Sequence, residues 1–151
     1  MKILFINPPD LNKVSEYALD EHSKEYIESD DFGAFPPLGL LYVMSYLEKS
    51  EPHHELFFKD CVAERVGHKA LVEYIEKIKP DIVGMTSFTI GLVDCVLAAQ
   101  NIRKIVPDAH ICLGGHHPIA FPFEAASLPQ FNSIVVGEGE IAFTKLVKAI
   151  E

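Results

Sequence analysis

Three short segments of the chain combine glycine with hydroxyl, imidazole or carboxylate side chains, and each follows an apolar run. They are residues 87–89 (Ser-Phe-Thr), 114–117 (Gly-Gly-His-His) and 137–140 (Gly-Glu-Gly-Glu). Glycines at strand ends let another molecule approach the backbone closely, and hydroxyls can donate or accept hydrogen bonds to it. The same glycines could serve only as turns with a positive φ. Together the three segments predict a narrow binding slot between the fourth and fifth apolar runs, the runs that precede the last two segments, with the hydroxyls of the first segment at its side.

The segment after the first apolar run narrows the choice of ligand. It reads Asn7-Pro8-Pro9-Asp10, whereas a dinucleotide-binding fold needs a Gly-x-Gly-x-x-Gly turn here and a flavodoxin needs a phosphate loop rich in hydroxyls and glycine. The two prolines remove amide donors that a phosphate would need. A phosphorylated receiver domain would carry an acidic pair here and a carboxylate after the third strand, where residues 86–89 (Thr-Ser-Phe-Thr) have none. These three uses of an α/β fold are therefore disfavoured.

The motifs alternate with β-rich runs and amphipathic segments. Helical spacing of apolar residues covers 38–45, 71–78, 92–106 and 143–150, with a weaker helix over 118–127. Most of the β-rich runs are continuously apolar, as in parallel strands covered on both faces. The fold expected is α/β: a doubly wound, five-stranded parallel sheet in a flavodoxin-like (Rossmann-like) three-layer sandwich with strand order 2-1-3-4-5. Its strands are expected at residues 3–7, 55–59, 81–86, 109–113 and 133–136.

Length and composition indicate a single domain over residues 1–151, with 48% hydrophobic and 23% charged residues. The net charge of −9 argues against nucleic acid or an anionic membrane as a partner. No apolar run reaches the ~18 residues of a membrane span, and the apolar start is too short for a signal peptide. Three widely spaced cysteines indicate a reducing, cytoplasmic compartment and provide no metal or iron–sulfur clamp.

Residues 11–35 form a long insertion between the first strand and the first helix. They contain seven acidic residues and two lysines, and so carry more than half of the net charge. Loops of this length tend to be functional or disordered, and this one would lie at the carboxyl edge of the sheet, where such folds bind ligands. We expect either an acidic lid over the site or a solvated, partly helical flap.

Five motifs, in order along the chain, resemble the cobalamin (vitamin B12)-binding domain at the N-terminus of B12-dependent radical S-adenosylmethionine enzymes. They are residues 3–9 (ILFINPP), 36–41 (PPLGLL), 79–87 (KPDIVGMTS), 113–117 (LGGHH) and 135–140 (VVGEGE). In B12-binding domains Ser-x-Leu or Ser-x-Thr follows the third strand and Gly-Gly follows the fourth. The resemblance implies that the corrin lies across the carboxyl edge, with the nucleotide tail between the sheet and its helices. The cofactor-binding residues that it implies are Pro8, Pro9, Gly39, Ser87, Phe88, Thr89, Gly114, Gly115, His117, Gly137, Glu138 and Gly139.

One element of the histidine-ligated B12 fold is missing from this sequence. That fold carries Asp-x-His-x-x-Gly after the first strand, and its histidine binds cobalt. Here Asp10 has no histidine near it, the first along the chain being His22, as in the radical-enzyme subgroup. The resemblance therefore implies base-off, His-off cobalamin, with no metal ligand from this chain.

The resemblance implies that this chain has no catalytic residues of its own and works with a downstream radical S-adenosylmethionine domain. That domain, absent from the sequence, would hold a 4Fe-4S cluster and S-adenosylmethionine, and the joint reaction would be methyl transfer or related radical chemistry. The alternative is a free-standing flavodoxin-like module that binds another protein through the acidic insertion and holds no corrinoid.

Overall fold

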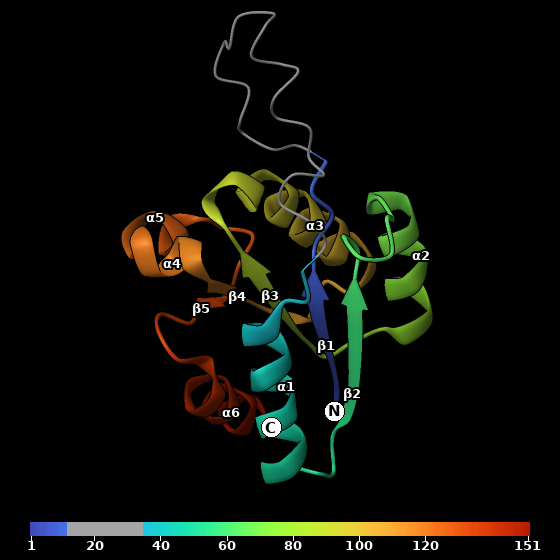
Figure 1. Cartoon of the computed structure of the whole chain (residues 1–151). Coiled ribbons are helices and arrows are strands. Elements are labelled where there is room, and N and C mark those ends of the chain that lie inside the picture. Colours follow the sequence, from blue (N-terminus) through green and yellow to red (C-terminus); the bar gives the residue numbers. More distant parts are fainter. Residues whose placement is uncertain (12–34) are drawn as a thin grey trace, which may run out of the picture.

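All strands of the sheet run parallel, in the order β2-β1-β3-β4-β5 (Figure 1). The structure is a computed structural model that describes residues 1–11 and 35–151. Five strands lie within these two ranges, so the predicted fold class and strand order are confirmed. The strands are β1 (Lys2–Asn7), β2 (Glu55–Asp60), β3 (Ile82–Ser87), β4 (His110–Gly115) and β5 (Ser133–Ile134).

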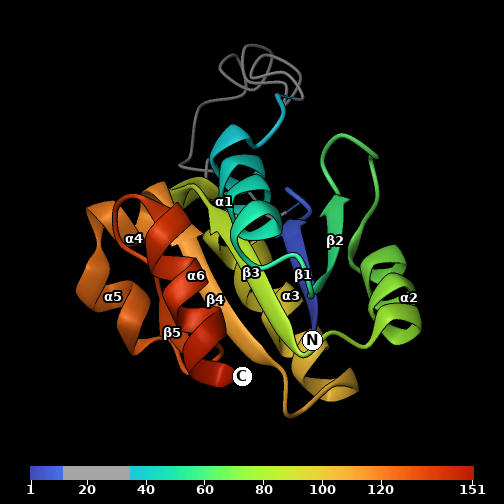
Figure 2. The same cartoon turned by 90° about the horizontal axis from the view of Figure 1, so that it is seen from below.

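Helices cover both faces of this sheet, as Figures 1 and 2 show. Helices α1 and α6 pack on one face, while α2, α3 and α5 pack on the other. A 3₁₀ turn, η3, precedes α3, and α4 follows β4 directly. The bounds are α1 (Leu38–Ser50), α2 (His68–Ile78), η3 (Thr89–Gly91), α3 (Leu92–Ile105), α4 (His116–Ala120), α5 (Pro122–Ser127) and α6 (Gly139–Ile150).

The apolar run of β1 supplies both halves of the core. Successive side chains of a strand point to opposite faces, so a strand covered on both sides needs apolar residues at every position. Ile3 and Phe5 join the cluster under α1 and α6, whereas Leu4 and Ile6 join the cluster under α2 and α3. The ring of Phe5 lies 5.2 Å from that of Phe143 on α6, measured between centroids.

Backbone geometry explains where α2 ends. Lys79 has a left-handed φ of 52°, and its N–H donates to the carbonyl oxygen of Ile75 at 2.8 Å, which closes the last turn. Pro80 follows and cannot continue a helix. The helix end that the sequence predicted before Pro80 is therefore confirmed.

Several boundaries differ from the sequence-based expectation. Strand β4 runs on to Gly115, β3 runs on to Ser87, and β5 keeps only two of the four expected residues. The single helix expected over 118–127 is instead two short helices, and the first begins at His116. They separate at Phe121, whose φ of −133° is not helical, because a residue before proline is disfavoured in the α region.

The acidic insertion predicted over residues 11–35 lies outside the described residues, except for its two ends, Leu11 and Phe35. Among the helices of the two described ranges, none combines the length and the apolar character that crossing a membrane would take.

Candidate functional site

The carboxyl edge of the sheet brings together two of the motifs found in the sequence. In the β3–β4 register Thr86 pairs with Gly114, and Ser87 pairs with Gly115. The hydroxyl-bearing segment and the glycine pair are therefore neighbours. Ser87 is 4% exposed, and its Oγ lies 3.5 Å from the carbonyl oxygen of Gly114, while Thr89 is exposed at the start of η3.

The glycine pair has a structural reason within the sheet itself. Gly115 has a φ of +95°, and a Cβ there would lie 2.6 Å from both the backbone N and O of Ser87. Residues with a side chain rarely adopt such a φ, and β3 occupies the space that a Cβ at Gly115 would need. Gly115 is thus required by the close approach of two strands. At Gly114 a Cβ would meet its nearest atom, the carbonyl oxygen of Met85, at 3.7 Å, which is an ordinary contact.

Strand β5 is too short to cover the end of β4. Among the described residues it pairs with β4 only through Cys112 and Leu113, and Val135 N–H then donates to the carbonyl oxygen of Leu113 at 2.9 Å. Gly114 and Gly115 therefore extend past the end of β5. The end of β4 therefore lies beside the place where the sequence predicted a binding slot between the fourth and fifth strands.

The turn that follows β5 is open at one glycine and closed at the next. Gly137 has a φ of +86°, and a Cβ built there meets no atom within 4 Å, so its surroundings are free. Gly139 begins α6, and a Cβ there would lie 2.7 Å from Cγ2 of Val43 on α1. Gly137 thus has room for a ligand, whereas Gly139 is needed for the packing of α1 against α6. Glu138, between them, is exposed.

Two histidines open α4 and have different surroundings. His117 is buried, with Nδ1 3.3 Å from Oγ1 of Thr89, and its buried Nε2 has no hydrogen-bond partner. His116 is exposed and stacks on Phe88, with ring centroids 4.5 Å apart and planes 10° from parallel. The sequence predicted a helix only from residue 118, but the helix starts at His116. The two side chains therefore reach back to the segment after β3.

Apolar side chains are exposed on the segments that follow these strands. Phe88 is 60% exposed and Phe121 is 48% exposed, although both are large enough to fill a core. Exposed apolar groups close together are a usual mark of a binding surface. The others from these segments are Ile90, Ile119 and Val136.

The remaining predicted site residues lie on β1 and α1. Pro8 and Pro9 are buried, and the preceding Asn7 donates from Nδ2 to Oδ1 of Asp60 at 2.8 Å, which joins the ends of β1 and β2. Gly39 is exposed in the first turn of α1, and a Cβ there would meet nothing within 4 Å. Within the described residues, no hydrogen bond joins Gly39, Pro8 or Pro9 to the residues at the carboxyl ends of β3 and β4.

The three cysteines cannot form a cluster-binding clamp in this fold. Cys61 and Cys95 are buried on the α2–α3 face, whereas Cys112 is buried on the α1–α6 face. Burial raises the pKa of Cys61 and of Cys95 to about 12 and that of Cys112 to about 11. They are protonated thiols on opposite sides of a sheet.

Sequence reasoning missed one buried ionisable pair near this edge. Nε2 of His68, the first residue of α2, lies 2.7 Å from Oδ1 of the fully buried Asp94 in the first turn of α3. The two residues lie 26 positions apart on separate helices, and no local pattern links them. The pair joins α2 to α3 rather than facing the glycine turn.

Two surface hollows lie away from the glycine-rich edge. One of about 310 Å³ is lined by residues of α3 together with Pro129 and Gln130. Another of about 490 Å³ lies at the amino end of the sheet, beside Met1 and Pro80.

The parallel sheet and its glycine-rich carboxyl edge define a doubly wound ligand-binding domain. The family model described as "B12 binding domain" matches residues 32–147. The chain therefore belongs to the B12-binding domain family, as the sequence motifs had predicted.

Curated relatives place this domain within longer proteins. An uncharacterized methyltransferase of Pyrococcus horikoshii is 32% identical over 116 residues, which is 76% of this chain and 25% of that protein. The anaerobic magnesium-protoporphyrin IX monomethyl ester cyclase of Rubrivivax gelatinosus is 29% identical over 152 residues, covering 100% of this chain and 25% of the cyclase. The chain thus spans about a quarter of the length of these relatives.

Solved structures share the fold at low identity. The radical S-adenosylmethionine methyltransferase TsrM of Kitasatospora setae matches 99% of this chain and 25% of its own, with a TM-score of 0.73 and 20% identity. A cobalamin-binding protein of Desulfitobacterium hafniense matches 99% of this chain and 58% of its own, with a TM-score of 0.63 and 14% identity. At these levels of identity, both similarities show that the fold is shared.

Proposed function

We propose that this domain holds base-off, His-off cobalamin across the carboxyl edge of its sheet and presents it to a radical S-adenosylmethionine catalytic domain. Membership of the B12-binding family supports the choice of ligand. The observation that carries the proposal is the end of β4, where Gly114 and Gly115 extend past the end of β5, and Gly137 in the turn after β5 has open surroundings. At this part of the carboxyl edge the backbone is accessible to a ligand.

The side chains at this edge fit a corrinoid. A corrin is a large, mainly apolar ring with amide side chains, and the exposed Phe88 and Phe121 offer apolar contact area. Thr89 offers a hydroxyl, and the buried Nε2 of His117 has no hydrogen-bond partner within the protein. Bound cobalamin supplies a cobalt centre that carries a methyl group or exchanges electrons. The chain's own residues bind and orient the ring.

The surroundings of the histidines support the His-off form. His117 is buried against Thr89, and His116 is stacked on Phe88, so each ring at this edge already has a protein neighbour. Asp10, which follows β1, has no histidine close to it in the sequence, and His22 lies outside the described residues. The domain would therefore bind the corrin without giving cobalt an axial ligand.

The need for a second domain rests on length and on the cysteines. The relatives named above are about four times as long as the match, and TsrM is a radical S-adenosylmethionine methyltransferase. The buried thiols of this chain lie on two faces of the sheet. The 4Fe-4S cluster and S-adenosylmethionine would therefore belong to a downstream domain, also in the cytoplasm.

Titration of the chain with hydroxocobalamin, followed by visible absorption after gel filtration, tests the ligand. We expect one equivalent to stay with the protein, and Gly114→Ala to weaken binding without unfolding, since a Cβ there has room. Ala149→Val is the matched control, because it enlarges an exposed position near the far end of α6. No retained corrinoid would contradict the proposal and favour a protein-interaction module.

A separate assay tests the division of labour. After anaerobic reconstitution with iron and sulfide, the chain alone is expected not to cleave S-adenosylmethionine to 5′-deoxyadenosine. The same assay with the downstream domain added should show cleavage. Turnover by the chain alone would overturn the assignment of the cluster to another domain.

A further inference from the structure

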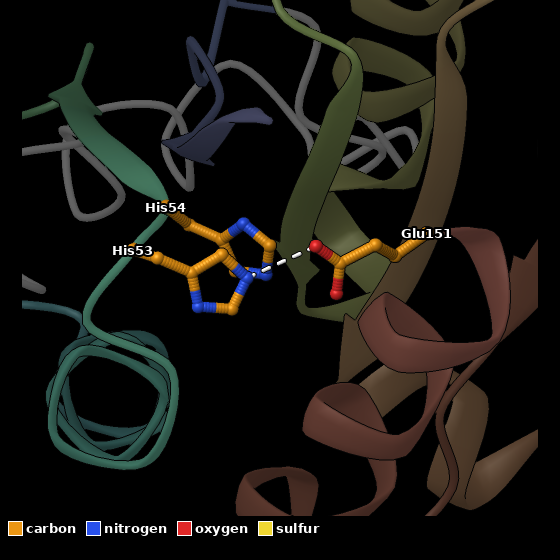
Figure 3. A group of neighbouring side chains, drawn as sticks. All are labelled: His53, His54 and Glu151. Atoms are coloured by element: carbon orange, nitrogen blue, oxygen red, sulfur yellow. Dashed lines mark hydrogen bonds and ion pairs between the residues drawn. The ribbon is translucent and has the colours of Figure 1, made fainter.

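A second group of polar side chains lies at the opposite end of the sheet from the glycine-rich edge. His53 and His54 stand between α1 and β2, and Glu151 follows α6 (Figure 3). One ligand atom from each residue lies within 4.8 Å of the other two. Nε2 of His53 is 3.0 Å from Oε1 of Glu151, and the two imidazole rings are 4.0 Å apart between centroids.

His54 is the member of this group with an unused ligand atom. Its side chain is buried, with the residue 8% exposed. Nδ1 lies 3.4 Å from the amino group of Met1, while the buried Nε2 has no hydrogen-bond partner. In Figure 3 the His54 ring lies behind that of His53, and both reach toward the carboxylate of Glu151. A buried polar atom without a partner is uncommon and calls for an explanation.

We propose that His53, His54 and Glu151 bind one divalent transition-metal ion of the Zn²⁺ type. Two imidazoles and one carboxylate form a donor set that Zn²⁺ accepts, with a fourth position left for water. Ligands about 2.0–2.1 Å from a tetrahedral zinc lie roughly 3.4 Å apart, so the group must close only slightly. Figure 1 shows both chain ends near this place, at the amino end of the strands.

Coordination through Nε2 of His54 requires that this atom carry no proton, so the proton of the neutral ring would sit on Nδ1. Ligating imidazoles bind metal in the neutral form, and a metal displaces protons from ligands that carry them.

Charges around the group are suited to a cation. Glu51 has one carboxylate oxygen 3.9 Å from Nδ1 of His53 and the other 2.5 Å from the amino nitrogen of Lys148. At 3.9 Å this oxygen is too far from Nδ1 to accept a hydrogen bond, but its negative charge attracts a cation bound at His53. The carboxyl end of α6 adds the partial negative charge of its free carbonyl groups. The ammonium groups of Lys148 and Met1 oppose the cation, the first already paired with Glu51.

The bound ion would join two segments that lie 98 residues apart. The turn before β2 and the end of α6 would be held by coordination in addition to the packing of α1 on α6. Such an ion stabilises the folded chain by an amount that grows with the logarithm of its free concentration, because the unfolded chain does not keep the three ligands together.

Isothermal titration of the apo-chain with Zn²⁺ tests the site, and His53→Ala and Glu151→Gln are the informative variants because both side chains are exposed. We expect one equivalent of Zn²⁺ for the parent chain and binding at least about tenfold weaker for each variant. His116→Ala and Glu48→Gln are matched controls at exposed positions outside the group, and they should bind as the parent does.

Thermal unfolding in the presence of Zn²⁺ gives a second readout. The parent and the control variants should gain stability, whereas the double variant His53→Ala/Glu151→Gln should gain none. Equal binding by parent and double variant, or no saturable binding by the parent, would overturn the proposal. Cobalamin titration of His53→Ala and Glu151→Gln should be unchanged, because the two sites lie at opposite edges of the sheet, so each proposal can fail on its own.

Discussion

The imidazole of His117 on α4 and the hydroxyl of Thr89 on η3 face each other beyond the paired ends of β3 and β4, with Nδ1 and Oγ1 3.3 Å apart. The contact is long for a hydrogen bond. It leaves Nε2 of His117 buried without a partner and Thr89 exposed. Both groups therefore have hydrogen-bonding capacity left for a ligand at this edge.

Replacing Thr89 by valine should weaken cobalamin binding while the fold persists. The change removes a hydroxyl from an exposed position, and one such hydrogen bond contributes about 0.5–1.5 kcal/mol. We expect roughly two- to tenfold weaker binding in an absorption titration. Ser45→Ala removes a hydroxyl from exposed α1 and should have no effect. Parent-like affinity of Thr89→Val would remove Thr89 from the site.

Alanine at Gly115 and alanine at Gly137 should differ in their effect on stability. Both positions have positive φ, but a Cβ at Gly115 would lie 2.6 Å from backbone atoms of Ser87, whereas Gly137 is open. Strain at such a φ costs about 1–3 kcal/mol, and the clash adds to it only at Gly115. Urea unfolding should therefore show the greater loss for Gly115→Ala. Equal losses would mean that β4 moves away from β3 freely.

These two glycines also show how far the sequence could lead. Parallel strands, their order and the motifs at their ends follow from apolar runs and local spacing, which are encoded within short segments. The reason for Gly115 is the backbone of Ser87 on another strand, and no local pattern contains that contact. The same applies to His68 and Asp94, which meet only once α2 and α3 have packed.

The group of His53, His54 and Glu151 at the amino end of the sheet could not be predicted from the sequence, for a similar reason. In the sequence His53 and His54 stand just before a predicted strand, and their position there does not indicate which distant residue they meet. Glu151 reaches them only because α6 lies beside α1 and runs back along the sheet. A pattern of ligands separated by 98 positions carries no local signal.

Cob(II)alamin bound to this chain should lack a nitrogen ligand below cobalt. The rings of His116 and His117 have protein neighbours at the carboxyl edge, and no histidine follows β1 closely. Electron paramagnetic resonance should accordingly show no nitrogen superhyperfine splitting from an imidazole. Splitting that disappears in His22→Ala or His117→Ala would contradict the His-off assignment.

The thiols of the folded chain should resist modification at neutral and mildly alkaline pH. Burial raises the pKa of Cys95 from 9.0 to about 12, and that of Cys112 to about 11. Because the thiolate is the reactive form, an aromatic disulfide reagent at pH 8 should label the native chain far more slowly than the urea-unfolded chain. Rapid labelling of the native chain at all three cysteines would contradict the buried positions.

The same pKa shifts predict a loss of stability in alkali. A thiol with a higher pKa in the folded chain contributes its stability below the unfolded value of about 9. That contribution is lost as pH rises toward 11 and 12, where the unfolded chain binds fewer protons than the folded one. The urea concentration at the unfolding midpoint should decrease as the pH is raised from 9 to 11. Cys95→Ser should make this decrease smaller.

The two-residue length of β5 has a consequence for amide hydrogen exchange. Few ladder hydrogen bonds hold this edge, so it can open at a much smaller free energy than β1 and β3 at the centre of the sheet. Amides of Val135 to Glu138 should exchange first, and those of β1 last. A ligand seated against Gly114 would have to order this edge, so its binding energy would be shared between contact and the loss of local motion.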